Sequence, residues 1–129
     1  MKETTLQWLE LAETDLVACK LLIEDPFLTN VVAFHAQQVC EKCFKAILEE
    51  HELQLHKTHN LTRLVGLIPN LPFDIDLTLL QLIDSVYTTS RYPGDLGLMP
   101  EGKPSIDLVK KLFNFADQVF KNTQIYLKH

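Results

Sequence analysis

The strongest helical pattern of the chain contains the residues Phe34-His35-Ala36-Gln37-Gln38-Val39-Cys40-Glu41-Lys42-Cys43-Phe44-Lys45-Ala46. Apolar residues recur at three- and four-residue spacing from Val32 to Leu48, which is the period of a helix with one buried face. We therefore expect a long helix that begins at Thr29 or Asn30 and ends near Glu52. A helix of this length can bury its apolar face only against other helices of similar length.

The segment before this stretch has the same period. It predicts a first long helix that is capped by Thr4 or Thr5 and ends at Asp25-Pro26, because the residue before a proline avoids helical geometry. The apolar positions expected to face the core are Trp8, Leu11, Ala12, Leu16, Cys19, Leu22 and Ile23. The first two helices can thus pack side by side along their whole length.

The second half predicts three further helices. Asn60 can cap a short helix over residues 61–68, a longer one covers about 76–90, and Ser105 can cap the last helix. Prolines and glycines over residues 91–104 mark a long loop between the last two. The expected fold is all-α, an up-and-down four-helix bundle with an additional short helix, in a single domain over residues 1–129.

Charge and cysteine content exclude several function classes. The formal net charge is −5 over 129 residues, and residues 1–60 carry the whole acidic excess, so no broad surface for duplex nucleic acid is expected. Three cysteines cannot all pair within one chain, which favours a reducing, cytoplasmic setting. We expect neither a signal peptide nor a membrane span, because no long uncharged apolar run occurs.

Polar side chains interrupt the apolar face of the stretch quoted above. Gln37, Glu41 and Lys45 follow one another at one-turn spacing, and Asp15 on the first helix is flanked by apolar positions. Burying such groups costs a few kcal/mol each unless they are hydrogen-bonded. If these faces of the two helices meet, the polar groups are therefore expected to form a hydrogen-bonded network or to line a water-filled pocket. The alternative is that Glu41 and Lys45 form a solvated pair on the surface.

A zinc site is the other chemistry that the sequence suggests. Cys40 and Cys43 have the spacing of a ligand pair, and His51, His56 and His59 follow. Structural zinc sites place the close cysteine pair on a turn, however, whereas this pair lies within a helix. We expect no metal and no cofactor, and in this interpretation His59 anchors the start of the short helix.

Four motifs in register resemble one family. They are Leu11-Ala12-Glu13-Thr14-Asp15-Leu16-Val17-Ala18-Cys19-Lys20-Leu21-Leu22; His35-Ala36-Gln37-Gln38 with Glu41-Lys42 and Lys45-Ala46; Lys57-Thr58-His59-Asn60-Leu61; and Tyr87 with Arg91-Tyr92-Pro93. In this order, over nearly the whole chain, they resemble the HEPN domain, named for higher eukaryotes, prokaryotes and nucleotide binding. The resemblance implies a helical bundle, frequent dimerisation and, in many bacterial members, a neighbouring or fused nucleotidyltransferase. Departures at Val39, Cys40, Cys43 and Asn60 alter packing more than chemistry.

Many HEPN proteins are metal-independent ribonucleases with an arginine and a histidine four to six residues apart. This chain departs from that motif, because the windows after Arg63 and Arg91 contain no histidine. Without a proton acceptor beside the arginine, general base catalysis is lost, and this contribution is typically worth roughly 10²- to 10⁴-fold in rate. RNA cleavage by this chain is therefore not expected.

The motif positions instead indicate a ligand-binding surface. Its expected residues are Asp15, Gln37, Glu41, Lys45, His59, Tyr87, Arg91 and Tyr92. Arg91 can form a bidentate contact with a phosphate, and Tyr92 can stack on a base or carry the modification that partner nucleotidyltransferases place on some HEPN tyrosines. Alternatively, Arg91-Tyr92-Pro93 only ends a helix and orders the loop.

The predicted function is a non-catalytic HEPN-like module that binds a nucleotide or substrate for a separate nucleotidyltransferase subunit, as in two-component or toxin–antitoxin systems. One alternative is a ribonuclease toxin with displaced catalytic residues, and another is a purely structural dimerisation bundle. A homodimer is expected because Trp8, Phe113, Phe115 and Phe120 exceed what one narrow buried stripe needs.

Overall fold

The computed structural model describes residues 1–54, 57–89 and 103–128, and these residues form helices and connecting segments with no strand among them. The elements are α1 (Glu3–Leu22), the 3-10 helix η1 (Pro26–Leu28), α2 (Thr29–Glu50), α3 (Leu61–Gly66), α4 (Leu77–Thr89) and α5 (Ile106–Leu127). The all-α prediction is confirmed. The predicted helix boundaries agree to within about three residues.

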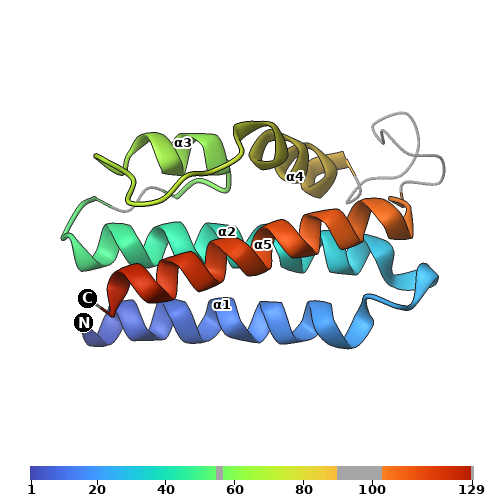
Figure 1. The fold of residues 1–129 in the computed structure, drawn as a ribbon, viewed down its shortest axis with the longest axis horizontal. Helices are drawn as coiled ribbons and strands as arrows, with labels where there is room; N and C mark the ends of the chain where they lie inside the picture. The colour runs from blue at the N-terminus through green and yellow to red at the C-terminus, as the bar shows by residue number, and fades with distance from the viewer. Residues whose placement is uncertain (55–56, 90–102, 129) are drawn as a thin grey trace.

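The helices form three layers in Figure 1: α1 along one edge, α2 and α5 in the middle, and α3 with α4 along the other edge. Successive long helices run in opposite directions, as expected for an up-and-down bundle, and both ends of the chain lie at the same end of it. α2 contacts α1, α3, α4 and α5. Side chains on several sides of α2 are therefore buried, which places its polar residues between neighbouring helices.

The core forms where the apolar face of α2 meets its neighbours. The predicted positions on α2 are fully buried, namely Val32, Ala33, Ala36, Cys40, Phe44, Ile47 and Leu48. Burial of each large apolar side chain contributes roughly 1.5–3 kcal/mol before the cost of ordering the chain. The face of α2 that remains polar is therefore held in one orientation by the packing of the opposite face.

Two of the predicted helix caps are present. Asn60 Oδ1 accepts a hydrogen bond from the Arg63 backbone N–H at 2.8 Å, and Ser105 Oγ accepts one from Leu108 N–H at 3.1 Å. Each bond satisfies an N–H group that the helix itself leaves unpaired. The cap at Asn60 also fixes the chain immediately after His59, which belongs to the site described below.

The predicted cap at Thr4 or Thr5 is wrong. α1 begins after Lys2 with no side-chain cap, and the two threonine hydroxyls donate to the carboxylates of Glu49 and Glu50 at 2.8 and 2.9 Å. A carboxylate on the neighbouring helix is a stronger acceptor than a neutral group, so the hydroxyls serve the contact between helices.

The buried stripe of α1 also differs from the prediction at one position. Leu11 is 49% exposed, whereas Leu9, which the spacing argument omitted, is buried. The reason is that α2 lies along the side of α1 that carries Thr5, Leu9, Ala12 and Leu16. Leu11 consequently lies at the margin of the contact.

α2 ends two residues earlier than predicted. The Leu53 and Glu52 backbone N–H groups bond to the carbonyls of Leu48 and Glu49 at 2.9 and 3.1 Å, and Glu52 adopts a positive φ of 56°. This is the Schellman arrangement, in which the left-handed position usually holds glycine. Among the described helices, none combines the length and the apolar character that a membrane span requires.

Candidate functional site

Glu41 is the centre of a buried polar network on α2. Its side chain is 5% exposed, and its Oε2 accepts a hydrogen bond from Lys45 Nζ at 3.0 Å. Its Oε1 lies 2.8 Å from His59 Nδ1 and 3.3 Å from Gln38 Nε2. Because a carboxylate only accepts, the His59 ring carries its hydrogen on Nδ1 in this contact. Both oxygens of Glu41 are therefore satisfied.

Gln37 extends this network towards α4. Its amide nitrogen donates to the His59 carbonyl at 2.7 Å and to Asp84 Oδ1 at 3.3 Å, while its oxygen accepts from Gln38 at 2.9 Å. Asp84 Oδ2 accepts the Leu61 backbone N–H at 2.7 Å. Burial, opposed by these hydrogen bonds, raises the pKa of Asp84 above its ordinary value. The amide thus fixes the segment that carries His59.

Asp15 forms a second network, between α1 and α2. Its Oδ1 lies 2.7 Å from His35 Nδ1, and its Oδ2 accepts a hydrogen bond from Lys42 at 2.5 Å. The carboxylate is 8% exposed, whereas His35 and Lys42 are 27% and 20% exposed. Asp15 is therefore bonded to residues of α2 other than Gln37, Glu41 and Lys45, with which it was expected to meet.

The two networks repeat one arrangement. In each, a buried carboxylate binds the Nδ1 of a histidine with one oxygen and a lysine ammonium with the other. Such a carboxylate orients the imidazole so that its Nε2 is left for other contacts. The solvated-pair alternative for Glu41 and Lys45 is wrong, since both side chains are almost completely buried.

Aromatic rings lie between the two histidines. The Phe34 ring contacts the His35 ring edge to face at 5.2 Å and stacks on Tyr87 at 5.6 Å, and the Tyr87 ring lies 6.4 Å from His59. This series of contacts joins α2, α4 and the segment before α3 on one side of the bundle. Tyr87, a predicted site residue, is therefore close to His59, although its side chain is mostly buried.

Trp8 forms the α1 side of the same region. Lys45 Nζ lies 5.6 Å from the centre of the Trp8 ring, which is a cation–π distance. Trp8 also lines a shallow recess of about 250 Å³ with Thr4, Gln7, Leu11 and Glu49. Since the chain has one tryptophan, its fluorescence reports directly on the surroundings of Lys45.

Most of the predicted site residues are brought together. Gln37, Glu41, Lys45, His59 and Tyr87 form one connected group, and Asp15 belongs to the neighbouring network. Arg91 and Tyr92 lie outside the described residues. The ring nitrogens of His59 and His35 are both bonded to carboxylates, of Glu41 and Asp15 respectively.

His35, Gln38, Lys42 and Asp84 are the site residues that sequence reasoning missed. His35 and Lys42 are seven residues apart, which places them on the same face of a helix, and this spacing could have indicated a shared partner. Asp84 gave no such signal, because its contact with Gln37 depends on the packing of α4 against α2.

The cysteines belong to the core. Cys19, Cys40 and Cys43 are all buried, and burial raises the pKa of the Cys43 thiol to about 12. Zinc binds thiolates, which this environment disfavours. Within residues 1–54, 57–89 and 103–128, no group of three metal-ligating side chains is assembled. His56 lies outside these ranges, and His51 bonds to Tyr126 instead.

Comparison with known proteins agrees with this architecture. The family model of the HEPN domain matches residues 5–125. The chain belongs to the HEPN domain family. The crystal structure of an archaeal HEPN homologue is similar to this HEPN chain, with a TM-score of 0.73, 25% identity, and coverage of 96% of this chain and 97% of that one. Among curated proteins, none matches the chain.

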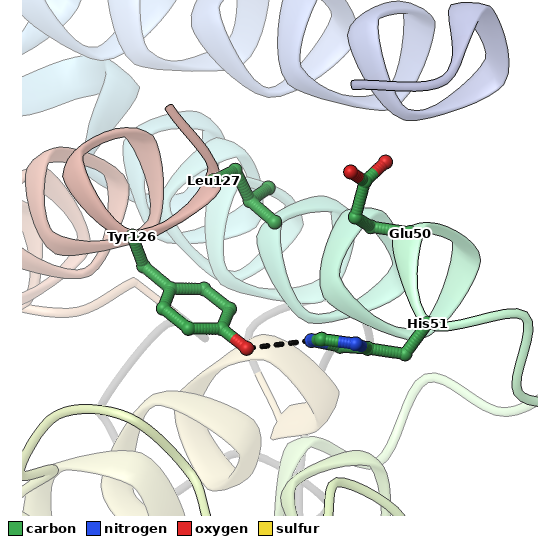
Figure 2. A pocket seen from close by; sticks show the side chains of 4 residues that line it. All are labelled: Glu50, His51, Tyr126 and Leu127. Atoms are coloured by element: carbon green, nitrogen blue, oxygen red, sulfur yellow. Dashed lines mark hydrogen bonds between the residues drawn. The ribbon is translucent and has the colours of Figure 1, made fainter. Parts of the chain in front are cut away.

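A separate recess lies where α2 and α5 of this HEPN domain end. Figure 2 shows that the Tyr126 hydroxyl points to the His51 ring, with an oxygen-to-Nε2 distance of 2.6 Å. Glu50 and Leu127 complete the recess of about 170 Å³. The Lys2 backbone N–H bonds to Glu50 and holds the pKa of its carboxyl below the ordinary value. This recess contains none of the predicted site residues.

The aromatic argument for self-association is not supported. Phe115 and Phe120 are buried within the HEPN bundle, and Phe113 and Trp8 are partly buried against its core. These aromatic side chains were expected to be more than one narrow buried stripe can hold. The buried face of α5 is wider than such a stripe, so it accommodates Phe115 and Phe120. Among the described residues, four of the eight exposed large apolar side chains lie on α1, namely Leu6, Leu11, Val17 and Leu21.

Proposed function

We propose that this HEPN domain binds a nucleotide, or another phosphate-bearing substrate, on the polar face of α2 for a separate nucleotidyltransferase subunit. The observation that supports this most directly is the pair of buried carboxylates, Asp15 and Glu41, each of which holds a histidine and a lysine. When its imidazole is protonated, each group carries one more positive than negative charge. Two such groups, both of which include residues of α2, favour a ligand with more than one negative charge.

The geometry allows direct contacts with phosphate oxygens. The His59 side chain is 66% exposed, so its Nε2 is accessible while its Nδ1 remains bonded to Glu41. His35 and Lys42 are partly exposed on α2. A protonated Nε2 and an ammonium both donate charge-assisted hydrogen bonds, which are the stronger kind. Because the carboxylates fix these donors in advance, little conformational entropy is lost on binding.

The charges of the site also support a partner that performs the chemistry. Metal-dependent nucleotidyl transfer needs carboxylates that are free to bind cations. Asp15 and Glu41 are bonded to histidine and lysine on both oxygens, so they do not offer such a pair. In this proposal the catalytic carboxylates come from the partner, Arg91 and Tyr92 contribute from outside the described residues, and the domain forms a cytoplasmic homodimer.

One observation favours a second candidate function. The Glu41–His59 pair is an imidazole oriented by a carboxylate, with its other nitrogen exposed, and this is the arrangement of a general base. In a metal-independent ribonuclease, His59 Nε2 would accept the proton of an attacking 2′-hydroxyl. The expected result is then cleavage of RNA without metal, which the His59→Asn substitution abolishes.

The test is a titration of Trp8 fluorescence with ATP, GTP, CTP and UTP in the absence of metal. We expect at least one nucleotide to change the emission, with affinity reduced about 10-fold or more by His35→Asn with His59→Asn. His51→Asn is the matched control, because His51 lies in the recess at the end of the bundle. No saturable change with any of the four nucleotides, or equal losses in site and control variants, would contradict the binding proposal.

Copurification tests the pairing separately. When the tagged domain is purified from its natural host, it is expected to retain a nucleotidyltransferase. Cleavage of an RNA oligonucleotide by the purified domain, lost with His59→Asn, would instead establish the ribonuclease candidate.

A further inference from the structure

The outer face of α1 carries exposed apolar side chains at helical spacing. Leu6, Val17 and Leu21 are 50%, 45% and 79% exposed, and Ile125 on α5 is 60% exposed. From Leu6 to Leu21 the stripe is about 22 Å long at a rise of about 1.5 Å per residue. Large apolar side chains are usually buried in a helix of this kind, so a row of them on one face indicates a contact surface.

The described part of the chain leaves this face uncovered. Figure 1 shows α1 along one edge of the bundle, with α2 and α5 on its inner side. Two shallow depressions of about 340 and 310 Å³ follow the stripe, and both are lined by Glu10 and Glu13. Val17 lines the first and Leu6 the second. Lys128 also lines the second depression, at the end of α5. The surface is therefore apolar at both ends and slightly concave, with Glu10 and Glu13 in its middle.

The two glutamates of this stripe have free charges. Glu10 and Glu13 are exposed, and neither carboxylate pairs with a cation among the described residues. The Glu49 and Glu50 carboxylates, in contrast, are bonded to residues at the start of α1. Unpaired carboxylates between exposed leucine and valine side chains match a partner that presents lysine or arginine between apolar residues.

We propose that the outer face of α1 binds a basic amphipathic helix of a partner protein. Apolar residues of that helix cover Leu6, Val17 and Leu21, and its lysines or arginines pair with Glu10 and Glu13. The partner is a different protein, because a second copy would bring the same acidic centre against itself. In a two-fold arrangement about the middle of the stripe, Glu13 would face Glu13 of the copy, which is unfavourable.

This surface is separate from the polar face of α2, so the inference does not depend on nucleotide binding. The residues that the partner contacts belong to α1, and Asp15, His35 and His59 take no part. A helix bound here leaves those three side chains as they are. The two proposals can therefore fail independently.

The test uses a labelled synthetic peptide of about 18 residues, enough for about five helical turns. Leucine occupies one face and lysine flanks it; a second peptide carries glutamate in place of every lysine. Fluorescence anisotropy measures binding to the wild-type chain and to the variant Glu10→Lys with Glu13→Lys. The matched control is Glu24→Lys with Glu52→Lys, which makes the same charge change at two side chains that are each 79% exposed.

We expect the lysine peptide to bind the wild type and the control with similar affinity, and to bind the Glu10 and Glu13 variant about 10-fold or more weakly. Val17→Ser weakens binding as well, because the apolar contact is lost. The proposal is overturned if the glutamate peptide binds equally well, if the control variant loses as much affinity, or if the lysine peptide shows no binding up to about 1 mM. A dimer in sedimentation that these glutamate substitutions dissociate would also overturn it, in favour of a second copy.

Discussion

Replacement of Lys45 by methionine tests whether the Glu41 network is a buried, interdependent group. The two side chains are 11% and 5% exposed, and 3.0 Å separates Lys45 Nζ from Glu41 Oε2. Methionine retains most of the apolar stem that packs near Trp8, so the substitution removes the charge with little change of volume. Glu41 would then keep His59 and Gln38 on Oε1 and lose its partner on Oε2.

The expected cost follows from this geometry. Breaking a buried ion pair by removal of one member costs about 3–5 kcal/mol, because the remaining charge is left without compensation. His59 continues to bond to Glu41, so we expect a loss of about 2–3 kcal/mol for Lys45→Met. Adding Glu41→Gln to Lys45→Met removes the unpaired charge. The double variant should recover about 1 kcal/mol or more of the lost unfolding free energy, so the effects of the two substitutions are not additive.

Urea unfolding, followed by circular dichroism and by Trp8 fluorescence, measures these free energies. Lys121→Met is the matched control, because Lys121 forms the same i,i+4 pair with Asp117 at 2.8 Å but is 61% exposed. An exposed pair of this kind contributes less than about 1 kcal/mol. If Lys45→Met costs no more than Lys121→Met, the Glu41 network is not a buried, interdependent group.

Three further predictions concern the rest of the fold. Glu52→Gly should stabilise the chain by about 0.5–1 kcal/mol in urea unfolding, because glycine adopts the positive φ of 56° without strain. A thiol reagent should label Cys43 and the other two cysteines only after denaturation, since all three are buried and burial raises the pKa of Cys43 to about 12. Labelling of the native chain would contradict this prediction. The lowered pKa of Glu50 gives stability that is complete above about pH 4.5 and is lost as the pH falls through the folded value. Glu50→Gln should therefore flatten the decline of the urea midpoint in acid, and an unchanged decline would exclude this group as its source.

The sequence was sufficient for the helices because local rules govern them. The spacing of apolar residues located α2 and α5, and Asn60 and Ser105 correctly marked the caps of α3 and α5. The cap at Thr4 failed because its hydroxyl has a better acceptor on a neighbouring helix, which no local rule can reveal. Local periodicity also could not decide that Leu11 lies outside the buried stripe of α1.

The site was predictable in part for the same reason. Gln37, Glu41 and Lys45 stand out because they interrupt an apolar stripe within one helix. The partners of Asp15 were not predictable, because the choice between His35 with Lys42 and Gln37 with Lys45 depends on how α1 is rotated against α2. Asp84 joins the network only through the packing of α4, from a distant part of the sequence.

Amide chemical shifts show directly whether the polar face of α2 binds a ligand. The nucleotide that gives the strongest Trp8 response is added to isotope-labelled protein, and shifts are mapped onto the chain. We expect the largest shifts at His35, Lys42, Lys45 and His59, with residues around His51 unaffected. Shifts confined to the His51 recess or to α5, or their absence at saturating nucleotide, would contradict it.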